Sequence, residues 1–180
     1  MSPDLGSPWR EFLAEIDALL DEPFCLHCIG GFAVIVGYGL PRSTNDLDYR
    51  AMIPANRIRD LQELAGEGSA LARKHKVRLQ YTGVDSMPEN YEERLTEIFP
   101  GHFANLRIAI PDPYDLILSK LSRGARRDRE DARFLANTKH LDPNILRERY
   151  REELRPILIG PEDRHDATLE YWLEECFNKS

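Results

Sequence analysis

The stretch CIGGFAVIVGYGLPRSTNDLDYR, residues 28–50, decides the fold of this chain. Two glycines, Gly30 and Gly31, open an apolar run, a polar turn follows, and Asp46 and Asp48 then flank a single leucine. The segment FCLHCI that leads into the glycines is typical of a short buried strand, and GFAVIVGYG after them favours a helix. DLDYRAMI alternates between polar and apolar residues and predicts a second strand. The pattern therefore predicts a strand, a glycine corner, a helix, a turn and a strand in succession.

The acidic pair and the glycine pair suggest chemistry when they are taken together. Asp46 and Asp48 are two positions apart on an expected strand, so both side chains leave the same face. Two neighbouring carboxylates repel each other, and a bound Mg²⁺ ion removes this cost because it prefers hard oxygen ligands. Gly30 and Gly31 have no Cβ atom, so their backbone N–H groups could approach a phosphate chain closely. The stretch indicates a site for a metal-bound triphosphate.

Each half of this pattern also has an ordinary interpretation. An isolated Asp-x-Asp occurs by chance on solvated strand edges, and Gly-Gly alone is usually a turn. Arg42 and Thr44, just before the acids, could reach phosphate or could serve turn chemistry and hydrogen bonding at the strand end. The prediction rests on the ordered combination.

Composition excludes several classes of protein. The chain has 180 residues and a net charge of -7, which argues against broad coating of nucleic acid. No apolar run approaches 18 residues and the first residues do not resemble a secretion signal, so we expect a cytoplasmic protein without a membrane partner. Cys25 and Cys28 have zinc-like spacing, but on a strand their side chains would point to opposite faces, so we expect small buried residues.

The pattern changes at the PDPYD turn. Strands alternate with helices up to residue 111, whereas only helices are expected beyond it. We expect an α/β (α+β) fold with a small mixed-sheet core over residues 1–111 and a helical half over residues 112–180 that completes an active-site cleft. The segment SRGARRDREDAR gathers five arginines, which could form a local basic patch or a solvated helix with ion pairs between neighbouring turns.

Two segments resemble a known group of enzymes. GGFAVIVGYGLPRSTNDLDY resembles the active-site segment of DNA polymerase-β-like nucleotidyltransferases, and more narrowly that of the AbiEii-like and MenT-like toxins of bacterial toxin–antitoxin systems. PYDLILSKLSRGARRDREDARFLA resembles the helical half of the same branch, and the resemblance covers residues 24–175. It implies Mg²⁺-dependent transfer of a nucleoside monophosphate from an NTP to an acceptor hydroxyl, with tRNA as an acceptor and an antitoxin protein as a partner.

The resemblance also implies roles for individual residues in both halves. The implied catalytic residues are Asp46, Asp48, Lys120 and Asp131, with Asp128 behind the last, and the implied nucleotide-binding residues are Gly30, Gly31, Arg42, Thr44 and Lys120. Asp46 and Asp48 are the implied Mg²⁺ ligands.

Three features depart from the pattern of the superfamily. Serine often follows the first glycine, and here that residue is Gly31. The later strand offers Gln80 where a third catalytic carboxylate is usual. Three alternatives are open: Asp85 supplies the third carboxylate, another acid supplies it, or the enzyme works with two acids. Lys120 and Asp131 would lie about 16 Å apart on one continuous helix. They can meet only if the chain bends, for which Gly124 is the natural place; otherwise Lys120 would be a solvent-facing residue at a helix end.

Two other functions stay open at this point. The chain could transfer a nucleotide to a protein or a small molecule, as in adenylylation of an antibiotic. Without a third acid it could also be a catalytically degenerate module that binds nucleotide only.

Overall fold

The structure, a computed structural model, describes residues 5–83 and 86–177. The chain forms two units, one comprising Met1–Val84 and Leu95–Ile110, and the other comprising Asp85–Arg94 and Pro111–Ser180. We refer to them as the sheet unit and the helical unit. The expected α+β class is confirmed, since a five-stranded mixed sheet is joined to a set of helices. The segment 85–94 belongs to the helical unit although it precedes the last two strands of the sheet unit.

The sheet unit is built on strands in the order β3-β2-β1-β5-β4. β1 is antiparallel to β2 and parallel to β5, β2 is parallel to β3, and β4 is antiparallel to β5. The strands are β1 (Phe24–Ile29), β2 (Asp46–Ile53), β3 (Arg78–Tyr81), β4 (Thr96–Ile98) and β5 (Leu106–Ile110). The glycine corner thus follows one central strand, and the acidic pair begins its neighbour.

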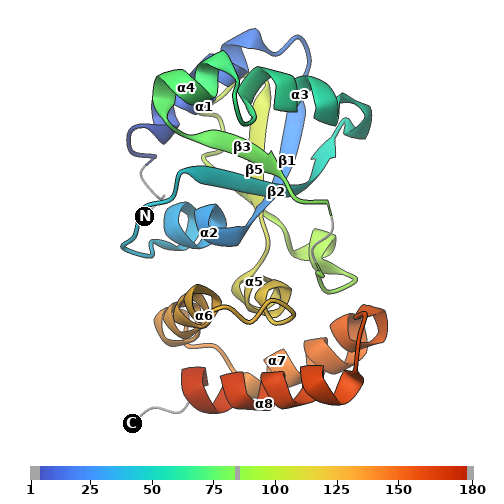
Figure 1. The fold of residues 1–180 in the computed structure, drawn as a ribbon. Helices are drawn as coiled ribbons and strands as arrows, with labels where there is room; N and C mark the ends of the chain where they lie inside the picture. The colour runs from blue at the N-terminus through green and yellow to red at the C-terminus, as the bar shows by residue number, and fades with distance from the viewer. Residues whose placement is uncertain (1–4, 84–85, 178–180) are drawn as a thin grey trace. The chain divides into compact units, whose positions relative to one another are not determined.

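Helices cover both faces of this sheet. Figure 1 shows α1, α3 and α4 together on one face and α2 on the other. These helices are α1 (Trp9–Leu19), α2 (Gly30–Phe32), α3 (Ile58–Ala65) and α4 (Ala70–His75); a π-helical turn, η1 (Ala33–Gly37), continues α2 and a 3-10 turn, η2 (Ala55–Arg57), precedes α3. The helix expected after the glycine pair is therefore confirmed, although α4 was not expected.

The alternation of β2 fixes which way its acids face. Leu47 and Tyr49 are fully buried, and the Tyr49 hydroxyl accepts a 2.8 Å hydrogen bond from Gln62 of α3. Because side chains alternate along a strand, Asp46 and Asp48 leave the opposite face, the one that carries α2. The same-face prediction for the two acids is confirmed.

The helical unit contains the helices that were expected after residue 111. They are α5 (Pro113–Lys120), α6 (Arg126–Thr138), α7 (Pro143–Arg149) and α8 (Glu162–Phe177), with η4 (Tyr150–Leu154) and η5 (Arg155–Ile157) continuing α7, and η3 (Tyr91–Arg94) earlier in the chain. Asp112 starts α5 by accepting a 2.9 Å bond from the Asp115 N–H, with Pro113 in the first turn. In the described residues, no helix combines the length and the apolarity that crossing a bilayer requires.

An ion-pair network ties the segment before Leu95 to these helices. Arg94 donates two hydrogen bonds to Asp115, of 2.8 and 3.0 Å, and two to Glu153, of 3.1 and 2.6 Å. Arg149 adds a 3.0 Å bond to Asp115. Asp115 is fully buried, and this burial raises its pKa although the hydrogen bonds from Arg94 oppose the shift. Both arginines are therefore structural counter-ions of one buried carboxylate.

Candidate active site

The carboxylate of the second aspartate lies close to the glycine corner. Gly30 has φ +67, and a Cβ atom added to it would lie 2.4 Å from Oδ2 of Asp48. The register explains the approach, because Ile29 at the end of β1 pairs with Asp48 on β2. Only glycine combines this backbone angle with this close approach. The corner is therefore shaped to let a carboxylate lie against the main chain.

The second glycine borders the turn that precedes the acids. A Cβ atom at Gly31 would lie 3.6 Å from Nη2 of Arg42 and 3.8 Å from Oγ1 of Thr44, which is ordinary van der Waals contact. The structure thus brings the guanidinium and the hydroxyl to the same corner, as the nucleotide-binding prediction requires. An added side chain at Gly31 would therefore find room.

Thr44 has a local role that can be seen directly. Its hydroxyl donates a 3.1 Å hydrogen bond to the Asp46 carbonyl and accepts a 3.4 Å bond from the Asp46 N–H. This turn holds the first residue of β2 at a fixed angle. The strand-end role considered from the sequence is confirmed for Thr44, and contact with phosphate stays a prediction.

Asp46 has a cation beside it and an acceptor atom without a hydrogen bond. Its Oδ1 lies 2.9 Å from Nε of Arg78, but the atom is buried and accepts no hydrogen bond from residues 5–83 and 86–177. Arg78 supplies a neighbouring positive charge, but a buried carboxylate oxygen that accepts no hydrogen bond keeps part of its desolvation cost, and a bound metal ion would remove it. Asp46 and Asp48, two hard oxygen donors on one face, fit a Mg²⁺ ion on this ground.

The protein supplies few ligands for such an ion. No group of three or more histidine, cysteine or acidic side chains with metal-binding geometry occurs in the part of the chain that the structure describes. Mg²⁺ tolerates this because it keeps water and phosphate oxygens in its coordination shell.

Burial raises the pKa of the Cys28 thiol well above its usual value, so this residue of the C-x-x-C pair stays neutral.

The neighbouring strand places an amide and a guanidinium beside the acids. The parallel register sets Arg78 next to Asp46 and Gln80 next to Asp48. Partners across a sheet share a face, so Gln80 lies where the third carboxylate was sought. The other candidate for it, Asp85, falls outside the described residues. Arg78 was missed from the sequence, although its position two residues before Gln80 on an alternating strand was a usable signal.

The residues predicted in the helical unit form a buried cluster of their own. Lys120 Nζ lies 3.0 Å from Asp131 Oδ2 and 3.5 Å from Asp128 Oδ1, and all three side chains are at most 4% exposed. Gly124, at φ +61, turns the chain between α5 and α6, so the bend that the sequence required is present. The alternative of a solvent-facing Lys120 is wrong. Catalytic roles for Lys120 and Asp131 stay predictions.

Asp128 is the anchor of that cluster. It accepts hydrogen bonds of 2.8 and 2.6 Å from Arg123 and one of 3.1 Å from the Ala125 N–H. Burial alone would raise the pKa of Asp128, but the Arg123 hydrogen bonds and the charges of Lys120 and Arg123 outweigh it, and the pKa is lowered. Asp128 is therefore a permanent anion at neutral pH.

Comparison with known families agrees with this geometry. The model of a family described as "Nucleotidyltransferase of unknown function (DUF6036)" matches residues 10–179. The chain belongs to this family. Neither curated proteins nor solved structures gave a match. The resemblance seen in the sequence is thus confirmed at the level of nucleotidyltransferases, and the narrower AbiEii-like and MenT-like branch stays a prediction. As a nucleotidyltransferase, the protein is a transferase that takes a nucleoside triphosphate as substrate.

Proposed function

We propose that this nucleotidyltransferase uses Mg²⁺ to move a nucleoside monophosphate from an NTP to an acceptor hydroxyl, and that the acceptor is tRNA. The observation that carries the proposal is the close approach of the Asp48 carboxylate to Gly30, which leaves no room for a Cβ atom there. It joins the element suited to phosphate, a corner without side chains, to one of two carboxylates suited to metal.

The chain's own residues would divide the work as follows. Asp46 and Asp48 would hold the metal, which supplies charge neutralisation at the phosphates when bound. The backbone of Gly30 and Gly31 would bind the phosphate chain, and the Arg42 guanidinium near Gly31 would take up charge on the departing pyrophosphate. Thr44 would keep Asp46 in place through its two hydrogen bonds.

The reaction is a single displacement at phosphorus. The acceptor oxygen forms a bond to the α-phosphorus while the bond from that phosphorus to the bridging oxygen breaks, so pyrophosphate leaves with the bonding electrons. The acceptor proton passes to solvent. Preorganised positive charge and positioning supply most of the rate enhancement in such reactions.

Labelled nucleotides test the acceptor directly. The protein is incubated with Mg²⁺ and each α-labelled NTP, together with bulk tRNA or with a protein extract. We expect label in tRNA, and label only in the protein fraction would defeat the tRNA acceptor in favour of protein modification. Binding of Mg²⁺–NTP by calorimetry without any transfer would instead favour a degenerate module.

A matched pair of variants keeps this test specific. Asp46→Asn removes a proposed metal ligand, whereas Asp21→Asn makes the same chemical change at a side chain that is 71% exposed. We expect only the first to abolish transfer. A toxin role is tested by growth of cells that express the wild type or the Asp46→Asn, Asp48→Asn double variant, because equal growth would remove the support for a toxin. The proposed antitoxin partner is tested in the same cells: co-expression of a candidate antitoxin with the wild type should restore growth.

A further inference from the structure

The helical unit carries a hollow that the proposed reaction does not use. Its volume is about 760 Å³, and its walls come from the α5–α6 turn, from α6, and from the segment 159–172 that leads into and forms much of α8. Arg123, Arg129 and Arg164 line it, together with Ser122, Thr168 and Tyr171. No aspartate or glutamate is among the described residues that line it. A hollow with this lining favours an anionic ligand.

Two of these arginines are not neutralised by the protein. Arg129 donates a 2.8 Å hydrogen bond to the Tyr171 hydroxyl, which is uncharged. Within residues 5–83 and 86–177, neither Arg129 nor Arg164 has a carboxylate within 4.0 Å, whereas Arg123 is bonded to Asp128. Arginine is the residue best suited to phosphate because its planar fork donates several hydrogen bonds. The hollow therefore presents two guanidinium charges that an incoming phosphate can neutralise.

α8 separates its charges around its axis. Arg164, Thr168 and Tyr171 recur at a spacing of three to four residues, so they lie along one face, which borders the hollow. Asp166 and Glu170 lie on the opposite face, where they pair with Arg155 and Arg147. A helix that needed only solubility could mix its charges. Glu175, one turn beyond Tyr171 on the same face, pairs with Arg133 and does not line the hollow. Arg164 is therefore the charge that this face presents to the hollow, on a chain whose net charge is -7.

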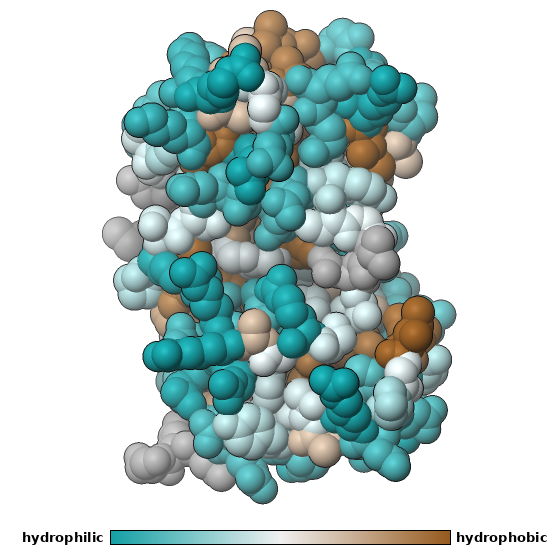
Figure 2. Space-filling view, in the orientation of Figure 1, coloured by the Kyte–Doolittle hydropathy of each residue, from teal (hydrophilic) through white to brown (hydrophobic). Residues whose placement is uncertain are grey.

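Aromatic and aliphatic surface accompanies the positive charge. The Tyr171 side chain is 45% exposed, and the Arg129 guanidinium carbon lies 5.6 Å from the centre of its ring. Ile159, at the edge of the hollow, is 94% exposed, and Figure 2 shows hydrophobic surface over the segment between η5 and α8. Exposed rings beside arginines are the combination on which single-stranded nucleic acids stack their bases.

We propose that this hollow binds single-stranded nucleic acid, with phosphates on Arg129 and Arg164 and a base against Tyr171 and Ile159. The inference concerns binding alone and does not rest on the proposed transfer reaction, since the hollow is complete within the helical unit. It also differs from the broad coating that the net charge excludes, because the contact is confined to one hollow.

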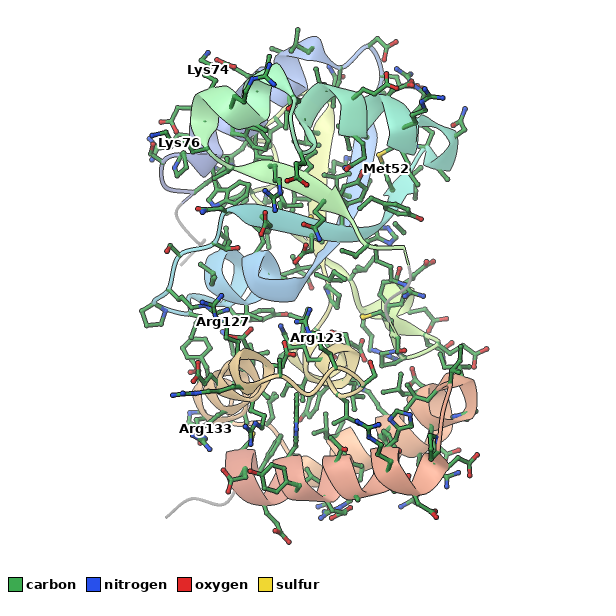
Figure 3. All side chains as sticks on the ribbon, in the orientation of Figure 1. Met52, Lys74, Lys76, Arg123, Arg127 and Arg133 are labelled. Atoms are coloured by element: carbon green, nitrogen blue, oxygen red, sulfur yellow. The ribbon has the colours of Figure 1, made fainter. Side chains whose placement is uncertain are left out.

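The test measures the binding constant of a fluorescent oligoribonucleotide of eight nucleotides for the full chain, without NTP or Mg²⁺, over a range of salt concentrations. For single strands, each neutralised phosphate adds about 0.7 to the slope of log K against log salt. Arg164→Gln should therefore lower the slope by about 0.7. Arg127→Gln is the matched control, because it lies on α6, does not line the hollow and is exposed. Figure 3 shows Arg127 on the side of α6 opposite Arg133, whose partner Glu175 belongs to α8.

Substitutions at Tyr171 separate stacking from charge. Tyr171→Leu should weaken binding by roughly fivefold to 150-fold, since stacking on an aromatic ring contributes about 1–3 kcal/mol per base. Tyr171→Phe keeps the ring and loses only the hydrogen bond that the Tyr171 hydroxyl accepts from Arg129. It should therefore bind the oligonucleotide within about threefold of the wild type, the size of one lost hydrogen bond. Urea denaturation of each variant verifies that it is folded.

Competitors identify the class of ligand. Inorganic tripolyphosphate and a polyglutamate peptide are each added to the bound oligonucleotide. We expect both to compete weakly. The proposal would be overturned if tripolyphosphate bound as tightly as the oligonucleotide and displaced it, and if Tyr171→Leu did not weaken oligonucleotide binding. That result would show a site for free phosphate. Equal binding of polyglutamate, or equal salt slopes for the Arg164→Gln and Arg127→Gln variants, would overturn it as well.

Discussion

Replacing Gly30 by alanine tests the contact on which the proposed active site depends. An alanine at φ +67 is strained by about 1–2 kcal/mol, part of which is offset because alanine also restricts the unfolded chain. The new Cβ atom would also lie 2.4 Å from Asp48 Oδ2, whereas ordinary contact begins at 3.4 Å. The carboxylate must therefore retreat by about 1 Å. A displacement of that size at a catalytic group can cost about a hundredfold in rate, so we expect a hundredfold slower transfer of label from NTP.

Two other glycines provide controls for this variant. Gly39 has φ +82 but no atom within 4 Å of an added Cβ, so Gly39→Ala measures the backbone strain alone. Gly31→Ala makes only ordinary contacts and has no such strain, so it should fold normally. Urea midpoints should fall for both Gly30→Ala and Gly39→Ala, while transfer should collapse for Gly30→Ala and persist for Gly39→Ala. If Gly30→Ala retained the transfer rate of Gly39→Ala, the carboxylate would have no need of the glycine corner.

Three further perturbations follow from single contacts. Arg78→Met removes the cation that would compete with Mg²⁺ for Asp46. Mg²⁺ should then bind the nucleotide-free protein about fivefold more tightly, the effect of a partly exposed ion pair. If calorimetry gave an unchanged or weaker Mg²⁺ affinity, the guanidinium and the metal would not compete. Lys120→Met leaves its two acidic partners buried without their shared cation and should lower the free energy of unfolding by about 3 kcal/mol; a loss below about 1 kcal/mol would contradict this. The hydrogen bond from Arg155 lowers the pKa of Asp166 to about 2, so its stabilisation is complete above the ordinary value of 3.8 and is lost as the pH falls toward 2. Asp166→Asn should thus cost at most about 1 kcal/mol at pH 7, because its side chain is partly exposed, and progressively less as the pH falls through 2. A cost independent of pH in urea titrations would refute the ion pair.

The sequence was sufficient for the parts of the site that local rules control. The glycine corner, the helix after it and the shared face of Asp46 and Asp48 follow from backbone freedom and from the alternation of a strand, and each spans only a few residues. The bend at Gly124 was likewise required by distance along a helix. These predictions hold because neighbouring residues decide them.

The remaining features depend on pairing between distant segments. Arg78 reaches Asp46 because β3 lies parallel to β2, and nothing in either strand alone specifies that neighbour. The sequence left Lys120 open between solvent and site, and its burial comes from α6 packing back on α5. The short strand β4 was missed because its three residues adjoin a helical turn and are too few to show an alternation.

The segment that carries Arg94 has a practical consequence for dissecting the protein. The chain passes from one unit to the other at three places along its length, so no single cut yields both pieces intact. A fragment that starts at Pro111 would include Asp115 and Glu153 but would lose the guanidinium that bridges them. Expression of the second half by itself should therefore give a weakened fold, and grafting residues 86–94 onto it through a short linker should restore it.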